Sequence, residues 1–566
     1  MRRAKTGGSS FTRGGKYGIM KKKPNPAKGR RFMKFAVLSD THYISEALLY
    51  GDDRQESILM RQINRTAIRE LKERQDLDVV LITGDLTDAG DVDSHREFAA
   101  LLSDLKASGK RVYVLTATHD FHFSSAYVTA YGWPVNYTSK PWERPWYRPG
   151  SADVKALVKP ESRELPEADR APEIRRVLNM DELWALYSDF GPADAFSVCE
   201  SAYSYAVKLD DRLWCLMLNN NFRDVDAFLD MSPSYSPACL KWIEEILRQA
   251  EKAGAFVFAC THHPLVPPVP AYKIGGTTRN MRRASVVHTL ADLGLQLVFS
   301  GHTHFANVAF GVSDAGNVLC DVTTPSVNHL PPVYRIVELD GQTKTLTLQN
   351  AEITEADDCP VPEKTLCEHY RVRFVEEQRQ SIQKLPAPLS GVILGMRVKH
   401  FLPLVGRAAR LSKAEAAAIR EKKIFDLIMD CVVNMQVGDG AYTPDTPEYK
   451  FLMGLAAAAD SMIAAVPFVG LEKKLQGYTV SQIVEPMLFK NGVPDNESTF
   501  RFDTLPETLP TPVFTSRAGD VLIAVLSVFA LLVSPLSPAV TAAALPLASL
   551  AKKRRLKKQP FAPERY

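Results

Sequence analysis

The chain has 566 residues, which is more than one hydrophobic core usually organises, so two or three folded units are expected. Its 45% hydrophobic and 24% charged residues exclude a wholly disordered chain. The net charge of +4 comes from the two ends: residues 1–31 carry eleven Lys or Arg and no acid, and residues 552–566 carry seven against one acid. Removing these from 69 bases and 65 acids leaves 51 against 64, a net of −13 for residues 32–551, and an acidic body of this kind makes a nucleic-acid partner unexpected.

Residues 1–32 are predicted to form a basic disordered extension. No apolar run of the kind found in a secretory signal precedes Met33. The eight cysteines are scattered without a CxxC pair, and several, such as Cys215 and Cys260, stand inside apolar runs. This pattern is typical of buried, reduced thiols in a reducing compartment, so we expect the cytoplasm.

Residues 33–350 alternate short apolar runs with amphipathic stretches. Continuous apolar strands joined by helices predict an α/β core whose sheets are covered on their outer faces. Strands are expected at 34–40, 77–85, 111–117, 255–260, 295–301, 308–313, 316–324 and 333–339, with helices at 54–75, 94–109 and 236–254. The stretch 203–218 is expected to form two strands joined by a hairpin turn at 209–212. A Pro- and Trp-rich stretch at about 133–200 is predicted to be an insertion that shapes substrate binding.

The remainder of the chain is different in composition. Residues 351–517 are rich in Ala, Leu and Lys and are predicted to form a mostly helical domain, to which no chemistry is assigned. Residues 518–551 form an apolar, membrane-associating segment, and 552–566 a basic tail. The apolar part, 521–551, has three possible interpretations: a single membrane span, a shallow hairpin broken at Pro535 and Pro538, or a buried pair of core helices. Attachment to the cytoplasmic side of a membrane is expected, with a soluble cytoplasmic protein as the alternative.

Five short motifs carry Asp or His, each directly after an apolar run. They are "VLSDTH" with Asp40 and His42, "LITGDLTD" with Asp85 and Asp88, "VLTATHD" with His119 and Asp120, "FACTHHP" with His262 and His263, and "VFSGHTH" with His302 and His304. Open α/β sheets bind ligands at the carboxyl ends of their strands. Carboxylates and imidazoles that converge there are the usual ligands for two divalent metal ions.

In this order, "DTH", "GDLTD", "THD", "HHP" and "GHTH" resemble the signature of the calcineurin-like metallophosphoesterases over roughly residues 33–350. The resemblance implies a two-sheet β-sandwich flanked by helices, here followed by a helical domain and a C-terminal apolar segment. It implies two metal ions, Mn, Fe or Zn, and a metal-activated hydroxide that attacks a phosphoester.

Individual roles also follow from the resemblance. Asp40, His42 and His304 would hold the first metal, Asp85 would bridge both metals, and His262 and His302 would hold the second. His119 would protonate the leaving oxygen with Asp120 orienting its imidazole, while His263 and Asp88 would support the site without binding metal. His122 gains no role.

One position departs from the family pattern. The third motif reads Ala117-Thr118-His119-Asp120, where the family has Gly-Asn-His followed by an acid. A Thr hydroxyl is a shorter and weaker ligand than the Asn amide, so Thr118 predicts a weaker second metal site, and Thr118→Asn is expected to tighten it.

The functional prediction is a metal-dependent phosphodiesterase or phosphomonoesterase that acts on a small molecule or a lipid head group. The first alternative is a catalytically impaired phosphoesterase fold that serves as a membrane scaffold or binding module. A nuclease is a further alternative, but the acidic body disfavours it, because phosphate contacts need Lys and Arg.

Overall fold

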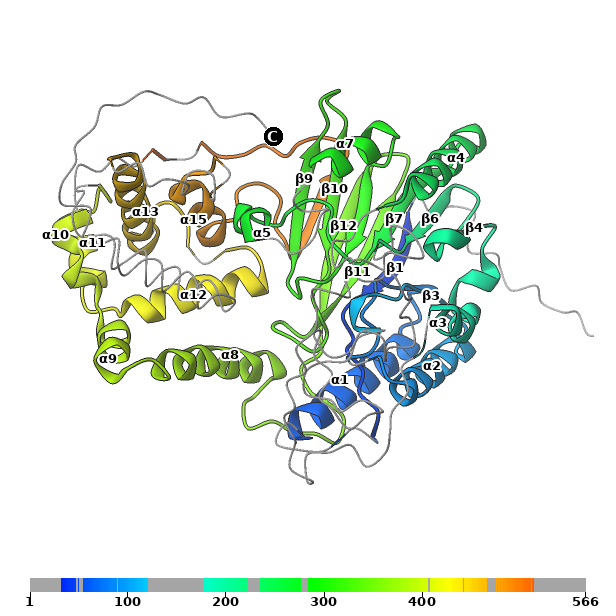
Figure 1. The fold of residues 1–566 in the computed structure, drawn as a ribbon, viewed down its shortest axis with the longest axis horizontal. Coiled ribbons are helices and arrows are strands. Elements are labelled where there is room, and N and C mark those ends of the chain that lie inside the picture. The colour runs from blue at the N-terminus through cyan, green and yellow to red at the C-terminus, as the bar shows by residue number, and fades with distance from the viewer. Residues whose placement is uncertain are drawn as a thin grey trace, which may run out of the picture.

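The computed structural model describes residues 32–120 without 47–48, 50–53 and 89, residues 178–220 without 179, residues 235–275, residues 284–465 without 406–407 and 441, and residues 475–513 without 476 and 511. The predictions made for residues 1–31, for His122 and most of the 133–200 insertion, and for residues 514–566 lie outside the described residues. Two parts are evident in Figure 1: a sheet-based body and, beside it, a group of helices that follows β12 in the chain.

The first sheet has six strands in the order β13-β12-β11-β1-β2-β3. Strands β1, β2 and β3 are parallel, while β11, β12 and β13 pair antiparallel on the other side of β1. The strands are β1 Met33–Leu38, β2 Val79–Ile82, β3 Arg111–Val114, β11 Val333–Asp340, β12 Thr345–Glu352 and β13 Ser498–Arg501.

The second sheet has seven strands in the order β4-β5-β6-β7-β8-β10-β9. Its central strands β6, β7, β8 and β10 run parallel, and antiparallel strands close both edges. The strands are β4 Ser197–Cys199, β5 Ser204–Lys208, β6 Leu213–Leu218, β7 Phe256–Thr261, β8 Leu297–Ser300, β9 Asn307–Val312 and β10 Val318–Thr323. Both sheets are therefore mixed, and the predicted two-sheet sandwich is confirmed.

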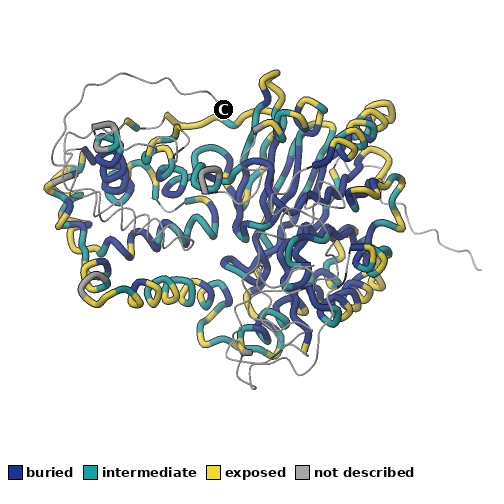
Figure 2. Tube along the Cα trace, viewed as in Figure 1, coloured by how far each residue is buried: buried dark blue, intermediate teal, exposed yellow. Residues whose placement is uncertain are grey.

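Alternation along the strands divides the core into three layers, because successive side chains of a strand point to opposite faces. In β1, Phe35 and Val37 pack between the sheets, where Phe35 stacks on Phe258 with ring centroids 5.4 Å apart. Ala36 and Leu38 face helices α1 (Arg54–Glu73) and α2 (Val92–Ala107) on the outer side of the first sheet. Figure 2 shows the resulting buried strands as dark blue segments.

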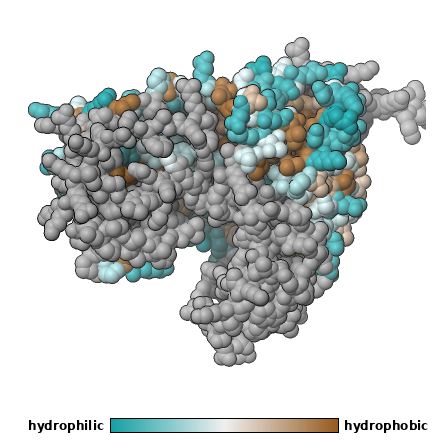
Figure 3. Space-filling view, turned by 45° about the horizontal axis from the view of Figure 1, so that its top comes forward, coloured by the Kyte–Doolittle hydropathy of each residue, from teal (hydrophilic) through white to brown (hydrophobic). Residues whose placement is uncertain are grey.

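Helices α4 (Pro237–Ala253) and α7 (Ala284–Asp292) cover the outer face of the second sheet. Helix α4 begins at Ser236, whose hydroxyl caps the helix by accepting from the Cys239 N–H, and it ends at Gly254 in a left-handed conformation. It buries one apolar face and leaves charged residues in water, so that hydrophilic side chains cover much of the described surface at the upper right of Figure 3. Short helices α3 (Met180–Leu186) and α5 (Pro270–Gly275) complete the body.

The helical region has its own core, built around Phe425, Tyr449 and Leu452. Its helices are α8 Leu366–Gln383, α9 Ala387–Gly395, α10 Leu402–Val405, α11 Lys413–Ile419, α12 Ile424–Val437, α13 Pro447–Ala465 and α15 Val480–Leu488. Among the described residues, no helix combines the length and apolar character that a membrane crossing needs.

The region 351–517, predicted to be mostly helical, also contributes to the first sheet. Strand β12 extends to Glu352, and the chain returns from the helices to form β13 beside it. The buried guanidinium of Arg335 on β11 reinforces this return. It donates to the carbonyl oxygens of Thr323 on β10 and of Asp495 just before β13, at 2.8 Å each. The helical region is therefore enclosed between two neighbouring strands of the first sheet.

Candidate metal centre

The strand-end motifs meet at one edge of the sandwich. Asp40 and His42 follow β1, Asp85 follows β2, His262 follows β7, and His302 follows β8. Backbone hydrogen bonds connect the loops that follow neighbouring strands. The Asp40 N–H donates to the Gly84 carbonyl at 3.0 Å, and the Gly301 N–H donates to the His262 carbonyl at 2.8 Å. Parallel strands deliver these side chains to a common edge because their carboxyl ends point the same way.

Five of the predicted ligands hold the backbone in the left-handed region. They are Asp40 (φ 50°), His42 (41°), Asp85 (49°), His302 (67°) and His304 (63°). This conformation is uncommon for residues other than glycine and costs on the order of 1 kcal/mol or more at each position. Position 301 also accepts no side chain, because a Cβ on Gly301 would overlap the Ser39 hydroxyl and clash with the Asp40 carboxylate. Such strain is typical of loops that are shaped by a site rather than by the fold.

Asp40, His42 and His304 form the first cluster of side chains. Their ligand atoms all lie within 4.8 Å of one another. His42 Nε2 and His304 Nε2 face each other at 3.2 Å, and His304 Nε2 lies 3.3 Å from Asp40 Oδ1. Three electron-rich atoms at such distances are the donor arrangement expected around a cation.

Asp85 and His262 connect the first cluster to a second. His262 Nε2 lies 3.0 Å from Asp85 Oδ2 and 3.9 Å from Asp40 Oδ1. The other ring nitrogen, Nδ1, lies 3.0 Å from the Thr83 carbonyl oxygen, which can only accept, so Nδ1 carries the hydrogen. Nε2 therefore faces the carboxylate oxygens of Asp85 and Asp40, and it can either donate a proton to them or, once deprotonated, offer its lone pair to a cation.

Electrostatics at this position favour positive charge. Burial lowers the pKa of His262, but the carboxylates of Asp85 and Asp40 outweigh it and raise the pKa to about 9. Burial likewise raises the pKa of Asp85, yet His262 and His119 hold it well below its usual value. Near neutral pH the His262 ring therefore carries the positive charge that these carboxylates attract, and a divalent cation at this point would take the place of its Nε2 proton.

His302 and His263 complete the second cluster with His262. The ligand atoms of the three imidazoles lie within 4.8 Å of one another, and the rings of His263 and His302 are 4.2 Å apart. Burial, followed by the charge of His262, lowers the pKa of His302 to about 3, so this ring is neutral near pH 7 and has a lone pair to offer.

His119 lies beside the first cluster and differs from the ligands in its accessibility. Its side chain is 40% exposed, whereas that of His262 is 1% exposed. Its backbone N–H donates to Asp85 Oδ1 at 2.9 Å, and its Nδ1 donates to the Asp88 carbonyl at 2.7 Å. Burial lowers the pKa of His119, but the carboxylates of Asp85 and Asp88 raise it further, so the net direction is upward.

Asp120 does not have the expected position beside the His119 ring. Its carboxylate accepts instead from the backbone N–H groups of Ala117 at 2.6 Å and Thr87 at 2.9 Å. Asp120 thereby fixes the loop that carries His119, and Asp88 orients the imidazole. Asp88 Oδ1 also lies 3.5 Å from His42 Nδ1, so Asp88 supports two rings at once.

Asn220 is a site residue that the sequence analysis missed. It is fully buried after β6 and hydrogen-bonds His263 through both ends of its amide. The signal was available, because "LNNN" follows the apolar strand at 213–218 just as the other motifs follow theirs. An Asn without Asp or His nearby is, however, a weak indication of a metal site.

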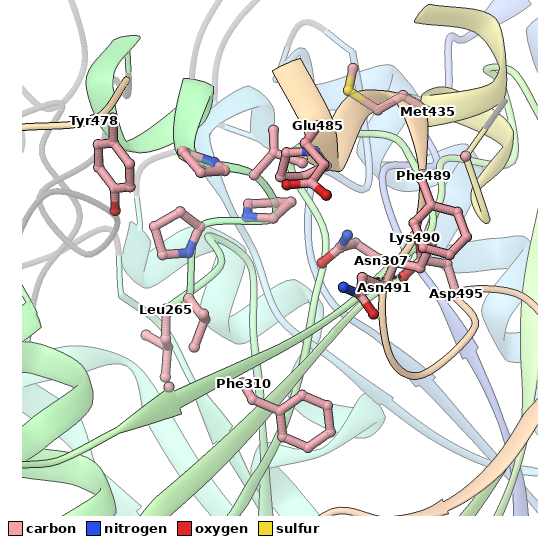
Figure 4. A pocket seen from close by; sticks show the side chains of 18 of the residues that line it. Leu265, Asn307, Phe310, Met435, Tyr478, Glu485, Phe489, Lys490, Asn491 and Asp495 are labelled. Atoms are coloured by element: carbon pink, nitrogen blue, oxygen red, sulfur yellow. Dashed lines mark ion pairs between the residues drawn. The ribbon is translucent and has the colours of Figure 1, made fainter. Parts of the chain in front are cut away.

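A cavity of about 460 Å³ lies elsewhere, between the second sheet and the helical region. Leu265 and Phe310 line it from the body, and Glu485 and Phe489 line it from α15 and the residue after it (Figure 4). None of the clustered Asp and His residues lines this cavity. It is therefore separate from the candidate metal centre.

Two solved structures illustrate the likeness of this fold to known proteins. A dimetal phosphatase from Danio rerio is 12% identical, with 56% of this chain and 96% of that chain covered and a TM-score of 0.33. A purple acid phosphatase from yellow lupin, Lupinus luteus, is 11% identical, with 59% and 53% covered and a TM-score of 0.33. No curated protein matches the sequence.

The family model for calcineurin-like phosphoesterases matches residues 33–306, which hold every clustered Asp and His described above. The match begins at β1 and ends two residues after His304. Over this stretch, which is just under half of its length, the chain is similar to the calcineurin-like phosphoesterases.

Proposed function

We propose that this chain hydrolyses phosphomonoesters or phosphodiesters of small molecules or lipid head groups. The observation that carries the proposal is the 3.0 Å approach of His262 Nε2 to Asp85 Oδ2, which joins two clusters of metal-ligand type into one centre. Asp40, His42 and His304 would hold the first cation, Asp85 would bridge, and His262 and His302 would hold the second, with Thr118 and His263 beside it. The acidic body supports a small substrate over a nucleic acid.

Bound divalent cations would supply the positive charge that offsets the phosphoester anion and would activate water near neutral pH. The strained loops fix the positions of the carboxylates and imidazoles, so that these groups need little reorganisation during the reaction.

His119 is the proposed proton donor. Its Nδ1 hydrogen is used by the Asp88 carbonyl, so the proton to be transferred is the one on Nε2. The carboxylates of Asp85 and Asp88 raise the pKa of His119 and so favour the protonated ring, and its exposure lets a leaving oxygen approach. The proton passes from Nε2 to the leaving oxygen as the phosphorus–oxygen bond breaks.

Turnover of p-nitrophenyl phosphate and bis-p-nitrophenyl phosphate, with and without Mn²⁺, tests the proposal. Metal-free protein is expected to be inactive and to recover with Mn²⁺, while Asp85→Asn loses at least ~10³-fold in kcat/KM, because it disturbs both clusters. Asp104→Asn, which alters an exposed carboxylate paired with Lys72, is the matched control and keeps full activity. Absence of metal-dependent turnover, with Asp85→Asn indistinguishable from the parent, would favour the scaffold alternative.

Membrane attachment through 521–551 is proposed from sequence alone, on the apolar run and the basic tail that follows it. Flotation with vesicles that contain anionic lipid is expected for the full chain and not for a chain ending at residue 517. Equal flotation of both would reject this anchor.

A further inference from the structure

We propose that His263, rather than Thr118, supplies the remaining protein donor to the second metal ion. The inference rests on the proposed function and adds a ligand that the family pattern does not predict. A ligand from His263, which follows β7, would explain why Thr118 can stand at a position where an amide ligand is expected.

The first argument is the tautomer of His263. Asn220 Nδ2 donates to the His263 carbonyl oxygen at 3.1 Å, and a carbonyl oxygen can only accept. This fixes the orientation of the amide and places Asn220 Oδ1 3.2 Å from His263 Nδ1, which must then carry the hydrogen. The other ring nitrogen, Nε2, is left with its lone pair. A ring nitrogen opposite to a fixed N–H donor is the arrangement found in metal-ligating histidines.

The second argument is the direction of that lone pair. Nε2 belongs to the cluster formed with His262 and His302, and it does not point into an apolar core. The oxygen Thr118 Oγ1 lies 3.4 Å away, which is long for a hydrogen bond to a ring nitrogen. The hydroxyl is therefore a weak partner for this nitrogen, and a cation can take its place.

The third argument is chemical. Asp85, His262, His302 and His263 together give one carboxylate and three imidazoles, a four-donor set that suits Zn, Fe or Mn. His263 is 3% exposed, so water competes poorly for its position. With Thr118 in place of His263, the second set has three strong donors and a neutral hydroxyl.

Calorimetric titration of the metal-free full-length protein with Mn²⁺ alone tests the assignment. The parent is expected to bind two ions, and His263→Phe, which keeps a ring but removes the donor, weakens one of the two sites at least ~10-fold. Thr118→Ala changes neither site by more than about threefold. His329→Phe is the matched control, because it removes an imidazole 5.3 Å from the His304 ring that belongs to no cluster, and it keeps both sites.

Thr118→Asn separates the two assignments even if His263→Phe does not fold. If His263 already fills the position, an added amide leaves the second affinity unchanged in the parent, while it restores binding in a His263→Ala background. Tightening of tenfold or more in Thr118→Asn alone, or two unaltered sites in His263→Phe, would overturn the assignment. A parent that binds no metal contradicts the proposed function itself, whereas a parent with two sites that His263→Phe leaves intact contradicts only this inference.

Discussion

At the scale of single residues, burial separates the side chains that would hold metal from the one that would donate a proton. His262 and Asp85 are almost completely buried, and carboxylates and imidazoles shift one another's pKa there. His119 shares those charges but keeps an exposed side chain. Loss of His119 should therefore change activity without changing metal content, whereas loss of a metal ligand should change both.

His119→Gln is expected to keep both metal ions and to lose activity in a way that depends on the leaving group. An alkyl phosphate ester needs a proton on its leaving oxygen, so kcat should fall by about 10²–10⁴-fold, whereas p-nitrophenyl phosphate, whose leaving group is a stable anion, should lose much less. Metal content and kcat for both esters are the measurements. Equal losses for the two esters, or loss of metal, would count against proton donation by His119.

At the scale of elements, the sequence was most informative where a strand and the residues directly after it together indicate a site. Each apolar run followed by Asp or His could be identified locally, and the common edge followed from parallel strands. The partners of Asp120 and Arg335 could not be identified in this way. Arg335 contacts Asp495, which is 160 positions later, and such contacts depend on how distant segments pack. The same reason hid β13, a four-residue strand with no pattern of its own.

Arg335→Met is expected to destabilise the protein. The variant leaves the carbonyl oxygens of Thr323 and Asp495 unpaired in the core, at roughly 1–3 kcal/mol for each acceptor, partly offset because a charge is no longer buried. Burial already lowers the pKa of Arg335 to about 10. The thermal midpoint should fall, while Arg501→Met, which alters an exposed arginine paired with Asp503, should change it little. Equal midpoints for the two variants would show that Arg335 does not hold the core.

At the scale of the whole molecule, the helical region is an insertion within the first sheet. The chain leaves the sheet at Glu352 and returns at Ser498 on the adjacent strand. Lys490 reinforces the return by donating to the Val308 carbonyl at 2.7 Å, and Asp495 accepts from the Val308 N–H at the same distance. The segment 490–503 therefore belongs to the body in structural terms.

Two shortened chains test this division. A chain of residues 33–362 lacks β13 and the partners of Arg335, and we expect it to aggregate because it exposes the edge of β12. A chain in which residues 366–488 are replaced by about ten Gly and Ser residues keeps β13 and should stay monomeric and bind metal. Size-exclusion chromatography and metal analysis are the measurements. Good behaviour of residues 33–362 alone would contradict the structural role of β13.

The left-handed ligand positions also determine which substitutions the metal centre tolerates during evolution or design. Besides glycine, only Asn, Asp and His are notably common in this conformation, so Asp40, His42, Asp85, His302 and His304 can be exchanged for few other residues. Thr118, His262 and His263 have ordinary backbone angles and are free of that restriction, and Thr118, a β-branched residue, stands where such a residue can be accommodated. His262 is nevertheless held between Asp85 and Asp40, so variation in metal preference should accumulate at positions 118 and 263, and a library at these two positions is a direct route to altered metal selectivity.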